Sequence, residues 1–352
     1  MEITLTYFFE LLKKLISIPS FSREEKDAAD YLETWLCANG MNPHRVGNNI
    51  WLGPSSTDKG KPTILLNAHI DTVKPSSGYT RDPFTPVEEK GRIYGLGSND
   101  DGGSLVALLI AYTYLIDSRQ PYNLYYSVSA EEEVGGKGGI ECLFPEIGKV
   151  DLGVIGEPTG MNLAVAEKGL MVLDCSAYGK SGHAARNEGV NAIYKALPSI
   201  DWFRNHQFRK VSPFLGPVKM TVTQINAGEQ HNMVPDKCSF VVDVRPNGMY
   251  SNQELLDMIT SEAGCEVKAR STRLGSSHID ESHPIVLKAK EMGLTLFGSP
   301  TTSNQALCPF PTVKIGPGES ARSHTADEFI ELEEISSGAE DYIMLLNGLN
   351  IL

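Results

Sequence analysis

The chain has 352 residues, of which 41% are hydrophobic and 21% charged, and its formal net charge is −13 at pH 7. This length supports one large domain or two of medium size, and the composition is that of a globular protein. The acidic balance argues against nucleic acid and anionic membranes as partners, and it is compatible with carboxylates that hold cations.

The amino-terminal segment and the cysteines bear on where the protein works. Residues 1–20 place charged side chains within an apolar pattern, which predicts an amphipathic helix and not a signal peptide with its uninterrupted apolar core. No apolar run reaches membrane-spanning length. The six cysteines form no C-x-x-C pair, and in a chain without an export signal they indicate reduced thiols. We therefore expect a soluble cytoplasmic protein.

Three apolar segments of strand length lead into side chains that can bind a metal. The first, residues 63–69, ends in His69, with Asp71 two positions later. Short apolar runs bounded by turn residues are typical of buried parallel strands, and such sheets bind ligands at the carboxyl ends of their strands. Residues two apart on an extended chain point the same way, so Asp71 is placed to orient the imidazole of His69.

The second and third of these segments lead into carboxylates. Residues 123–129 run into three consecutive glutamates at positions 131–133, and residues 151–155 are followed by Glu157. Adjacent carboxylates repel one another unless a positive group lies between them. The recurrence therefore predicts a cation at the edge of the sheet.

A glycine-rich stretch, residues 95–103 (GLGSNDDGG), precedes a long apolar helix expected over residues 104–116. It departs from the dinucleotide-binding fingerprint, because Asp100 replaces the third glycine and no glycine-rich turn follows the strand directly. Asp100 and Asp101 at a helix N-terminus would repel a pyrophosphate and attract a cation. Nucleotide binding is therefore rejected.

The remaining elements of this part of the chain are mostly helices. They are expected over residues 7–17, 24–39, 284–297 and 334–346. A capping box from Ser22 to Glu25 marks the start of the second. A strand expected at residues 312–315 precedes a turn that contains His324.

Beyond about residue 167 the pattern changes to that of half-exposed antiparallel strands. Strands are expected at residues 170–178, 218–225 and 238–244, and helices at 191–204 and 252–263. A capping box from Ser251 to Glu254 starts the second helix. The β-α-β-β-α-β order predicts a small ferredoxin-like α+β domain inserted into a larger α/β domain, whose mixed, mostly parallel sheet is flanked by helices. The expected boundaries are 1–167 and 276–352 for the discontinuous catalytic domain and 168–275 for the insertion.

Two histidines and five carboxylates form the candidate site, namely His69, Asp71, Asp100, Glu132, Glu133, Glu157 and His324. Imidazoles and carboxylates are the ligands that zinc accepts when it keeps a position open for water. A carboxylate shared between two ions holds them roughly 3.5–4 Å apart, and a water bound there reaches a pKa near ~7. A glutamate that binds no metal can then take up the proton and pass it to a leaving amine.

Together these ordered motifs resemble, over essentially the full length, the cocatalytic dizinc aminoacylase/carboxypeptidase family of metallopeptidases, and most closely its acetylornithine deacetylase-like deacylases. Residues 68–73 (AHIDTV) are similar to the family's first signature, which implies that His69 binds one zinc and that Asp71 orients it. Residues 95–100 (GLGSND) are similar to the second, which implies Asp100 as the bridging ligand.

The other metal motifs of the family lie further along the chain. Residues 131–135 (EEEVG) are similar to its Asp-Glu-Glu turn, which implies Glu132 as the general base and Glu133 as a ligand of the second zinc. The resemblance also implies Glu157 as a ligand of the first zinc. By the same resemblance, His324 is the partner of Glu133.

The sequence departs from the commoner pattern of the family at two places. Glu131 replaces the usual aspartate, which leaves a one-residue ambiguity of register across the three glutamates. Asp101 and Gly102 replace the usual Met-Lys, which leaves open whether Asp100 or Asp101 bridges the two metals. We favour Asp100.

The inserted domain resembles the lid and dimerisation domain of the family. The resemblance implies that His183 reaches the active site of a partner subunit to stabilise the tetrahedral oxyanion, and that Asn232 helps in the same place. Arg245 is similar to the arginine that grips the substrate carboxylate, a task for which a planar guanidinium is suited. Gly318, in the turn before His324, is expected to contact substrate. The resemblance thus implies a homodimer.

The resemblance implies a hydrolase of linear amides with two Zn²⁺ ions, for which Co²⁺ can substitute. The expected substrate is a small amino acid with an N-acetyl or N-succinyl group, such as acylornithine or acylcitrulline, in arginine biosynthesis. The alternatives within the family are a succinyl-diaminopimelate desuccinylase and a di- or tripeptidase. An alternative of another class is a non-catalytic metal- or amino-acid-binding scaffold, against which the presence of Glu132 and of all five expected ligands argues.

Overall fold

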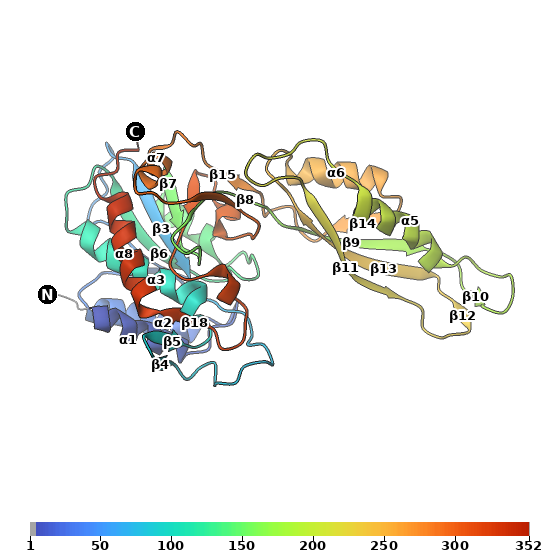
Figure 1. Cartoon of the computed structure of the whole chain (residues 1–352), viewed down its shortest axis with the longest axis horizontal. Coiled ribbons are helices and arrows are strands. Elements are labelled where there is room, and N and C mark those ends of the chain that lie inside the picture. Colours follow the sequence, from blue (N-terminus) through green and yellow to red (C-terminus); the bar gives the residue numbers. More distant parts are fainter. Residues whose placement is uncertain (1–4, 352) are drawn as a thin grey trace. The chain divides into compact units, whose positions relative to one another are not determined.

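The computed structural model describes residues 5–351, which form two compact units. The first unit comprises the chain up to residue 165 with residues 278–297 and those from 303 onward, and the second comprises residues 166–277 and 298–302 (Figure 1). The two ends of the long insertion lie within two residues of the expected boundaries. The short segment 298–302, which we expected in the catalytic domain, lies in the second unit.

A mixed sheet of nine strands organises the first unit. Its strands are β1 (His44–Val46), β2 (Asn49–Leu52), β3 (Thr63–His69), β6 (Asn123–Ser129), β7 (Leu152–Ile155), β8 (Leu163–Glu167), β15 (Ser277–His278), β16 (Leu296–Ser299) and β17 (Thr312–Lys314). Their order is β1-β2-β6-β3-β7-β17-β8-β15, with β16 beside β8. β6, β3, β7 and β17 run parallel to one another. Every residue of β3 and β6 is buried, which accounts for their nearly continuous apolar sequence.

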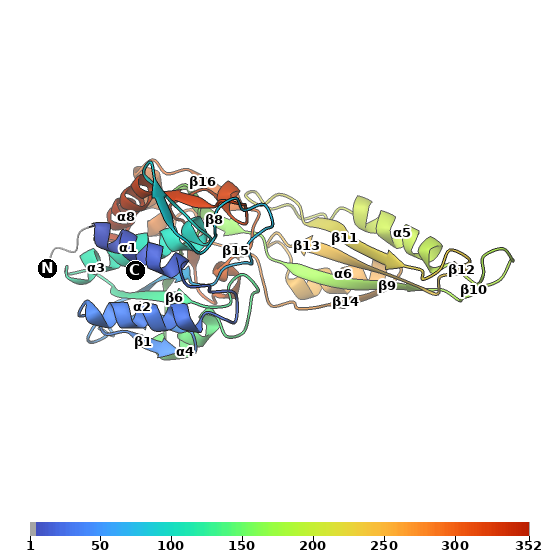
Figure 2. The ribbon, with the colours of Figure 1, turned by 90° about the horizontal axis from the view of Figure 1, so that it is seen from below.

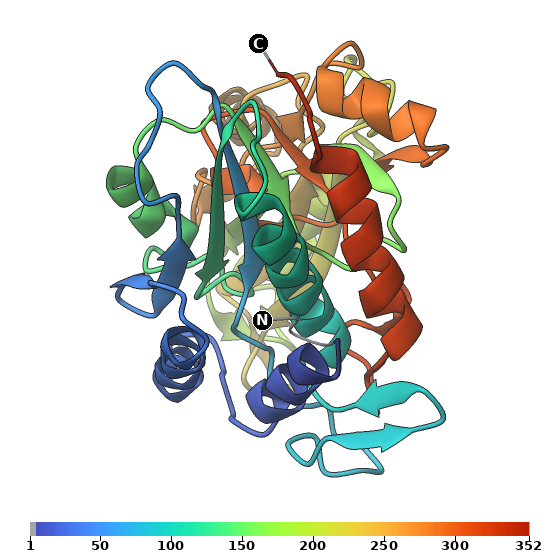
Figure 3. The same cartoon turned by 90° about the vertical axis from the view of Figure 1, so that its left-hand side faces the viewer.

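Helices cover both faces of this sheet. They are α1 (Leu5–Ile16), α2 (Lys26–Ala38), α3 (Gly103–Ile116), α4 (Phe144–Ile147), α7 (Pro284–Glu291) and α8 (Leu332–Leu346). On one face α3 packs against β6, where the hydroxyl of Tyr126 donates to the carbonyl of Leu105 at 3.0 Å, and α8 lies beside α3 (Figure 3). On the other face Leu65 of β3 belongs to an apolar cluster with Leu143 and Ile147. The α/β class and the mostly parallel central sheet expected from the sequence are confirmed.

Three local expectations differ from the structure. Ser22 does not cap α2, because its hydroxyl donates to the carboxylate of Asp71 at 2.7 Å and the helix has no side-chain cap. The helix expected over residues 284–297 ends at Glu291, because the chain then turns through Gly293, whose φ of +79° ends a helix readily. The third difference is β8, which we did not expect from the sequence.

The second unit is an antiparallel sheet with two helices packed on one face. Its main elements are β9 (Met171–Tyr178), α5 (Ala192–Asn205), β11 (Lys219–Ala227), β13 (Lys237–Arg245), α6 (Asn252–Glu262) and β14 (Glu266–Ala269), in the β-α-β-β-α-β order that the sequence predicts. The strands lie in the order β11-β13-β9-β14 (Figure 2). Alternate residues of β9 and β13 are buried against the helices, around Leu173, Phe203 and Phe240. The predicted capping box of α6, from Ser251 to Glu254, is present.

Two short sheets complete the fold. In the first unit β4 (Val87–Glu89), β5 (Arg92–Tyr94) and β18 (Phe329–Glu331) form a three-stranded sheet in the order β18-β5-β4. In the second unit β10 (Gly182–His183) pairs with β12 (Met233–Val234). Among residues 5–351, no helix combines the length and the apolar character needed to cross a membrane.

Candidate metal centre

The four parallel strands deliver their polar side chains to one edge of the sheet. β3 ends at His69, β6 is followed by Glu132 and Glu133, and β7 is followed by Glu157. His324 comes from the loop after β17. Because these strands are parallel neighbours, their carboxyl ends meet at the same edge, as the sequence predicts for a ligand site.

Asp100 lies between the two histidines. Its Oδ1 is 3.2 Å from Nε2 of His69, and its Oδ2 is 3.6 Å from Nε2 of His324. Nε2 of His324 is also 3.1 Å from a carboxylate oxygen of Glu133. Potential ligand atoms of His69, Asp100 and Glu133 all lie within 4.8 Å of one another. A carboxylate in this position has one oxygen available to each of two neighbouring cations.

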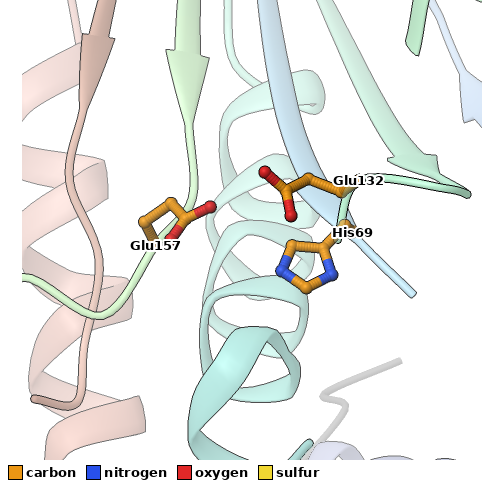
Figure 4. Close-up of side chains that lie close together, drawn as sticks. All are labelled: His69, Glu132 and Glu157. Carbon is orange, nitrogen blue, oxygen red and sulfur yellow. The ribbon is translucent and has the colours of Figure 1, made fainter. Parts of the chain in front are cut away.

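A second group of potential ligands shares His69. Atoms of His69, Glu132 and Glu157 also lie within 4.8 Å of one another. Figure 4 shows the three side chains converging from the end of β3 and from the loops that follow β6 and β7. The loop that carries Glu157 approaches Gly316 so closely that a Cβ there would lie 2.5 Å from the Glu157 carbonyl oxygen. Glycine is therefore needed at position 316.

Asp71 is fully buried behind His69 and ties the first strand to the glutamate turn. Its backbone carbonyl is 2.8 Å from Nδ1 of His69, and its Oδ1 is 3.6 Å from the same nitrogen. Its two carboxylate oxygens accept hydrogen bonds from the backbone N–H groups of Glu132 at 2.9 Å and Glu133 at 3.1 Å. Asp71 thus orients the imidazole and also fixes the turn that carries the two glutamates.

The structure separates the neighbouring carboxylates that the sequence leaves ambiguous. The carboxylate of Glu131 turns away from the cluster, where it accepts a hydrogen bond from the N–H of Gly138 at 3.3 Å and lies 3.9 Å from Arg23. The carboxylate of Asp101 accepts a hydrogen bond from the backbone N–H of His69 at 3.3 Å, and its Oδ1 has no hydrogen-bond partner. Asp100, and not Asp101, therefore lies between the two imidazoles.

The loop that carries Asp100 is held by Glu328, a residue to which the sequence analysis gave no role. The Glu328 carboxylate, only 2% exposed, accepts hydrogen bonds from the backbone N–H groups of Gly97 at 3.1 Å, Asn99 at 2.8 Å and Asp100 at 2.9 Å. The Asn99 side chain in turn bonds the backbone of Glu319 on both of its polar atoms. These contacts join the loop of Asp100 to the loop of His324. No motif in the sequence marks Glu328 for this role.

The carboxylates of the cluster have too little positive charge around them, and this changes their pKa values. Burial raises the pKa of Glu132 well above its usual value, and the charges of Glu133, Asp71 and Asp100 raise it further. Burial and the charge of Glu132 do the same to the pKa of Glu157. The hydrogen bond that the His324 ring donates to the Glu133 carboxylate raises the pKa of His324 to about 9. A bound cation would stabilise the deprotonated form of each of these groups.

The donor set fits divalent metal ions. Two imidazoles and the carboxylates of Asp100, Glu133 and Glu157 provide the nitrogen and oxygen ligands that zinc takes in catalytic sites, and the Glu132 carboxylate lies beside them. The hydrogen bond between His69 and Asp71 is the support that metal-bound histidines usually have. Two such ions would supply the positive charge that the clustered carboxylates lack.

The remaining predicted site residues lie in different places. Gly318 is in the first unit with a φ of +83°, and a Cβ there would lie 2.4 Å from Oδ1 of Asn99. His183 and Asn232 are neighbours in the second unit, where the N–H of Ala184 donates to the Asn232 carbonyl at 2.9 Å. Arg245 ends β13, and two of its nitrogens donate to the carboxylate of Asp243 at 2.8 and 3.0 Å.

Comparisons with known proteins agree with this description of the fold. Acetylornithine deacetylase of Proteus mirabilis (strain HI4320) is 29% identical over 376 aligned positions, which cover 97% of this chain and 96% of that protein. A tripeptidase from Staphylococcus aureus subsp. aureus Mu50 superposes with a TM-score of 0.80 at 19% identity, over 98% of both chains. The YXEP protein of Bacillus subtilis, described as a dinuclear metal-binding peptidase of the M20 family, superposes with a TM-score of 0.73 at 16% identity, over 97% of both chains.

The model of Peptidase family M20/M25/M40 matches residues 65–347. This range includes most of β3, all of β6 and β7, and the loops that carry the candidate metal-binding side chains. It extends through His324 and the Glu328 contacts to the end of α8. The chain therefore belongs to peptidase family M20/M25/M40.

Proposed function

We propose that this hydrolase removes an acyl group from the amino nitrogen of a small amino acid. The observation that carries the proposal is the 29% identity to an acetylornithine deacetylase over 97% of the chain. The solved structures that resemble the chain are less than 25% identical to it, and their likeness concerns the fold. Acylated ornithine, citrulline and related amino acids are therefore the proposed substrates, and arginine biosynthesis is the proposed pathway.

The metal-binding residues divide into two sets that share Asp100. We assign His69 and Glu157 to one zinc ion, and Glu133 and His324 to the other. When bound, such a pair polarises a substrate carbonyl and makes water more acidic. Asp71 acts beside them as a positioning residue, because it holds both the His69 ring and the backbone of the glutamate turn.

Glu132 is the proposed general base. Its carboxylate lies beside His69 and Glu157 but has no contact with His324, so it is placed to act at one side of the centre. Its raised pKa, which burial causes, suits a group that must accept a proton from water and give it to the departing amine at neutral pH. The water oxygen first bonds the carbonyl carbon to give a tetrahedral oxyanion, and the C–N bond then breaks as the amine leaves with the transferred proton.

A substrate panel tests the proposal. The purified chain, with zinc or cobalt added, is incubated separately with N-acetylornithine, N-acetylcitrulline, their N-succinyl counterparts, succinyl-diaminopimelate, and di- and tripeptides, and amine release is measured. We expect turnover of the acylated ornithine or citrulline and little of the peptides. Cleavage of peptides alone would identify a peptidase, and turnover of succinyl-diaminopimelate alone would identify the desuccinylase.

The second unit supports a homodimer. β11 is an edge strand that pairs only with β13 among the described strands, and Ile225 on it is exposed. On α5, Tyr194 is 71% and Leu197 53% exposed. A strand whose outer edge is unpaired, beside exposed apolar side chains, is a suitable surface for binding a second copy of the chain. Sedimentation of the wild type should give a dimer, and Tyr194→Glu with Leu197→Glu should give a monomer.

The dimer would let the second unit contribute to catalysis. We assign His183 and Asn232 to the oxyanion of a partner subunit, and Arg245 and Gly318 to substrate binding. In a dimer, mixing His183→Ala chains with inactive Glu132→Ala chains should restore activity. One active site of each heterodimer then combines Glu132 of the His183→Ala chain with His183 of its partner. No recovery in a mixture that forms heterodimers would exclude His183 from the partner's site.

A further inference from the structure

A cationic cavity lies entirely within the second unit, whereas the metal centre lies in the first. The cavity has a volume of about 470 Å³, which is within the range of small-molecule sites. It is bounded by the end of α5 and the segment after it, by the start of β11, and by Lys168. Neither the proposed reaction nor the proposed dimer gives this cavity a role.

The charge of the cavity is opposite to that of the chain. Lys168, Arg204 and Lys219 line it, and no aspartate or glutamate does. Although the chain carries a net charge of −13, none of these three side chains has a carboxylate within 4.0 Å anywhere in residues 5–351. His206, which also lines the cavity, has its own carboxylate partner, Glu262, at 3.7 Å. The three positive charges therefore lack a counter-ion from the protein.

Repulsion from neighbouring positive charges affects the pKa of Lys168. Its Nζ donates to the backbone carbonyl of Pro217 at 2.9 Å, which fixes the ammonium group at the cavity wall. Burial lowers the pKa of Lys168, and the charges of Lys219 and Arg245 lower it further. An anion in the cavity would remove this penalty, because it would stabilise the charged form of each cation.

Most of the rest of the lining is apolar, apart from His206 and Gln207. Its accessible apolar surface comes from Val211, which is 56% exposed, and the partly buried Met220, while Phe203 and Phe208 lie almost fully buried in the wall. An inorganic anion would leave this surface without a partner. A ligand with a carboxylate at one end and a hydrocarbon body at the other would satisfy both parts of the lining.

We propose that this cavity binds a small organic carboxylate. The carboxylate faces Lys168, Arg204 and Lys219, and the hydrocarbon part packs on Val211 and Met220. None of the candidate metal-binding residues lines this cavity, so we assign the ligand the role of an effector and not that of a substrate.

Calorimetric titration of the full-length, metal-loaded chain with benzoate tests this proposal. Lys219→Glu should weaken benzoate binding about tenfold or more, because it places a carboxylate among the cations. Lys195→Glu is the matched control, since Lys195 is an exposed lysine of α5 that does not line the cavity. It should leave the affinity unchanged. Arg204→Glu provides a second cavity variant, with the same expectation as Lys219→Glu.

Two further probes decide which chemistry the cavity selects. Benzamide, which lacks the charge, and inorganic phosphate, which lacks the apolar body, should each bind more weakly than benzoate. Benzoate can also bind at the metal centre, but binding there would be the same in Lys219→Glu and in the wild type. Unchanged affinity in both cavity variants, equal binding of benzamide, or tighter binding of phosphate would each overturn the proposal.

Discussion

Burial has opposite consequences in the two units. In the second unit the buried face of the sheet is apolar, with Leu173, Phe240 and Val242 each no more than 2% exposed. Removing such surface from water stabilises the fold by about 25 cal/mol per Å² without any ligand. In the first unit the buried edge of the sheet contains His69, Asp71 and other ionisable groups, whose burial costs free energy unless their charges are compensated. We therefore expect bound cations to stabilise the first unit and to contribute nothing to the stability of the second.

The largest expected effect separates chemistry from stability. Glu132→Ala should lower kcat by about two to four orders of magnitude, because it removes the proton carrier. It should also leave the metal content and the midpoint of urea unfolding close to those of the wild type. Glu132 is not one of the proposed metal ligands, and burial already disfavours its charged form, so removing this carboxylate should cost the fold little. Glu131→Ala is the matched control, since the Glu131 side chain turns away from the cluster. Normal turnover in Glu132→Ala would remove that residue from the mechanism.

The next effect concerns the support of the bridging aspartate. Glu328→Ala leaves three backbone N–H groups without an acceptor and should cost on the order of 3–5 kcal/mol of stability. The affinity for the second metal ion should fall as well, because the loops of Asp100 and His324 are no longer joined. Calorimetric unfolding and zinc titration measure the two quantities.

Glu328→Gln is the conservative comparison for that variant. Glutamine retains one carboxamide oxygen, and the oxygen Oε1 of Glu328 alone serves both Asn99 and Asp100. We expect this variant to keep most of the stability and most of the zinc affinity. If Glu328→Gln lost as much zinc affinity as Glu328→Ala, the role of Glu328 would not be to hold the Asp100 loop in place through these hydrogen bonds.

The pH dependence of stability should change sign when metal is removed. Burial raises the pKa of Glu328 to about 8 from 4.5, so between these pH values the folded chain holds a proton that the unfolded chain releases. The free energy of unfolding therefore falls as the pH rises from about 4.5 to about 8. His324 acts in the same direction: its stabilisation is complete below pH 6.5 and is lost as the pH rises through about 9.

Metal binding opposes this trend, because the ligands must lose their protons to bind. Chelator-treated protein should thus become less stable between pH 5 and 9, whereas zinc-loaded protein should become more stable over the same range. The lowered pKa values of Asp71 and Asp100 act only at more acid pH. Urea unfolding at several pH values, with and without zinc, measures both slopes. Parallel slopes would show that the cluster does not couple to metal.

The same contrast explains how far the sequence could predict the structure. Periodicity located β3, β6 and β9 almost to the residue, because each buries either both faces or one face along its whole length. It missed β8, whose five buried residues resemble any short apolar segment. The Ser22 capping box failed for another reason: a partner 49 residues away, Asp71, takes the hydroxyl that a local rule assigns to the helix.

The candidate site shows a similar division. The convergence of the candidate metal-binding residues could be predicted because each follows a strand or stands in a recognisable motif. The division of labour among adjacent acids could not, because it depends on backbone turns such as that of Glu131, whose φ is +55°. The role of Glu328 could not be predicted either, since its three partners are more than 200 residues away in sequence.

The smallest expected effect tests the second unit by itself. Ser251 caps α6 by accepting a hydrogen bond from the backbone N–H of Glu254, while the Glu254 side chain accepts one from the Ser251 backbone. Ser251→Ala should destabilise the chain by about 1 kcal/mol, because one N–H of the first turn loses its acceptor. Ser251→Thr keeps the hydroxyl and should cost much less. Because α6 packs only on the apolar core of the second unit, the loss should be the same with and without zinc. A loss that appeared only in the chelator-treated protein would show that the two units do not draw their stability from separate sources.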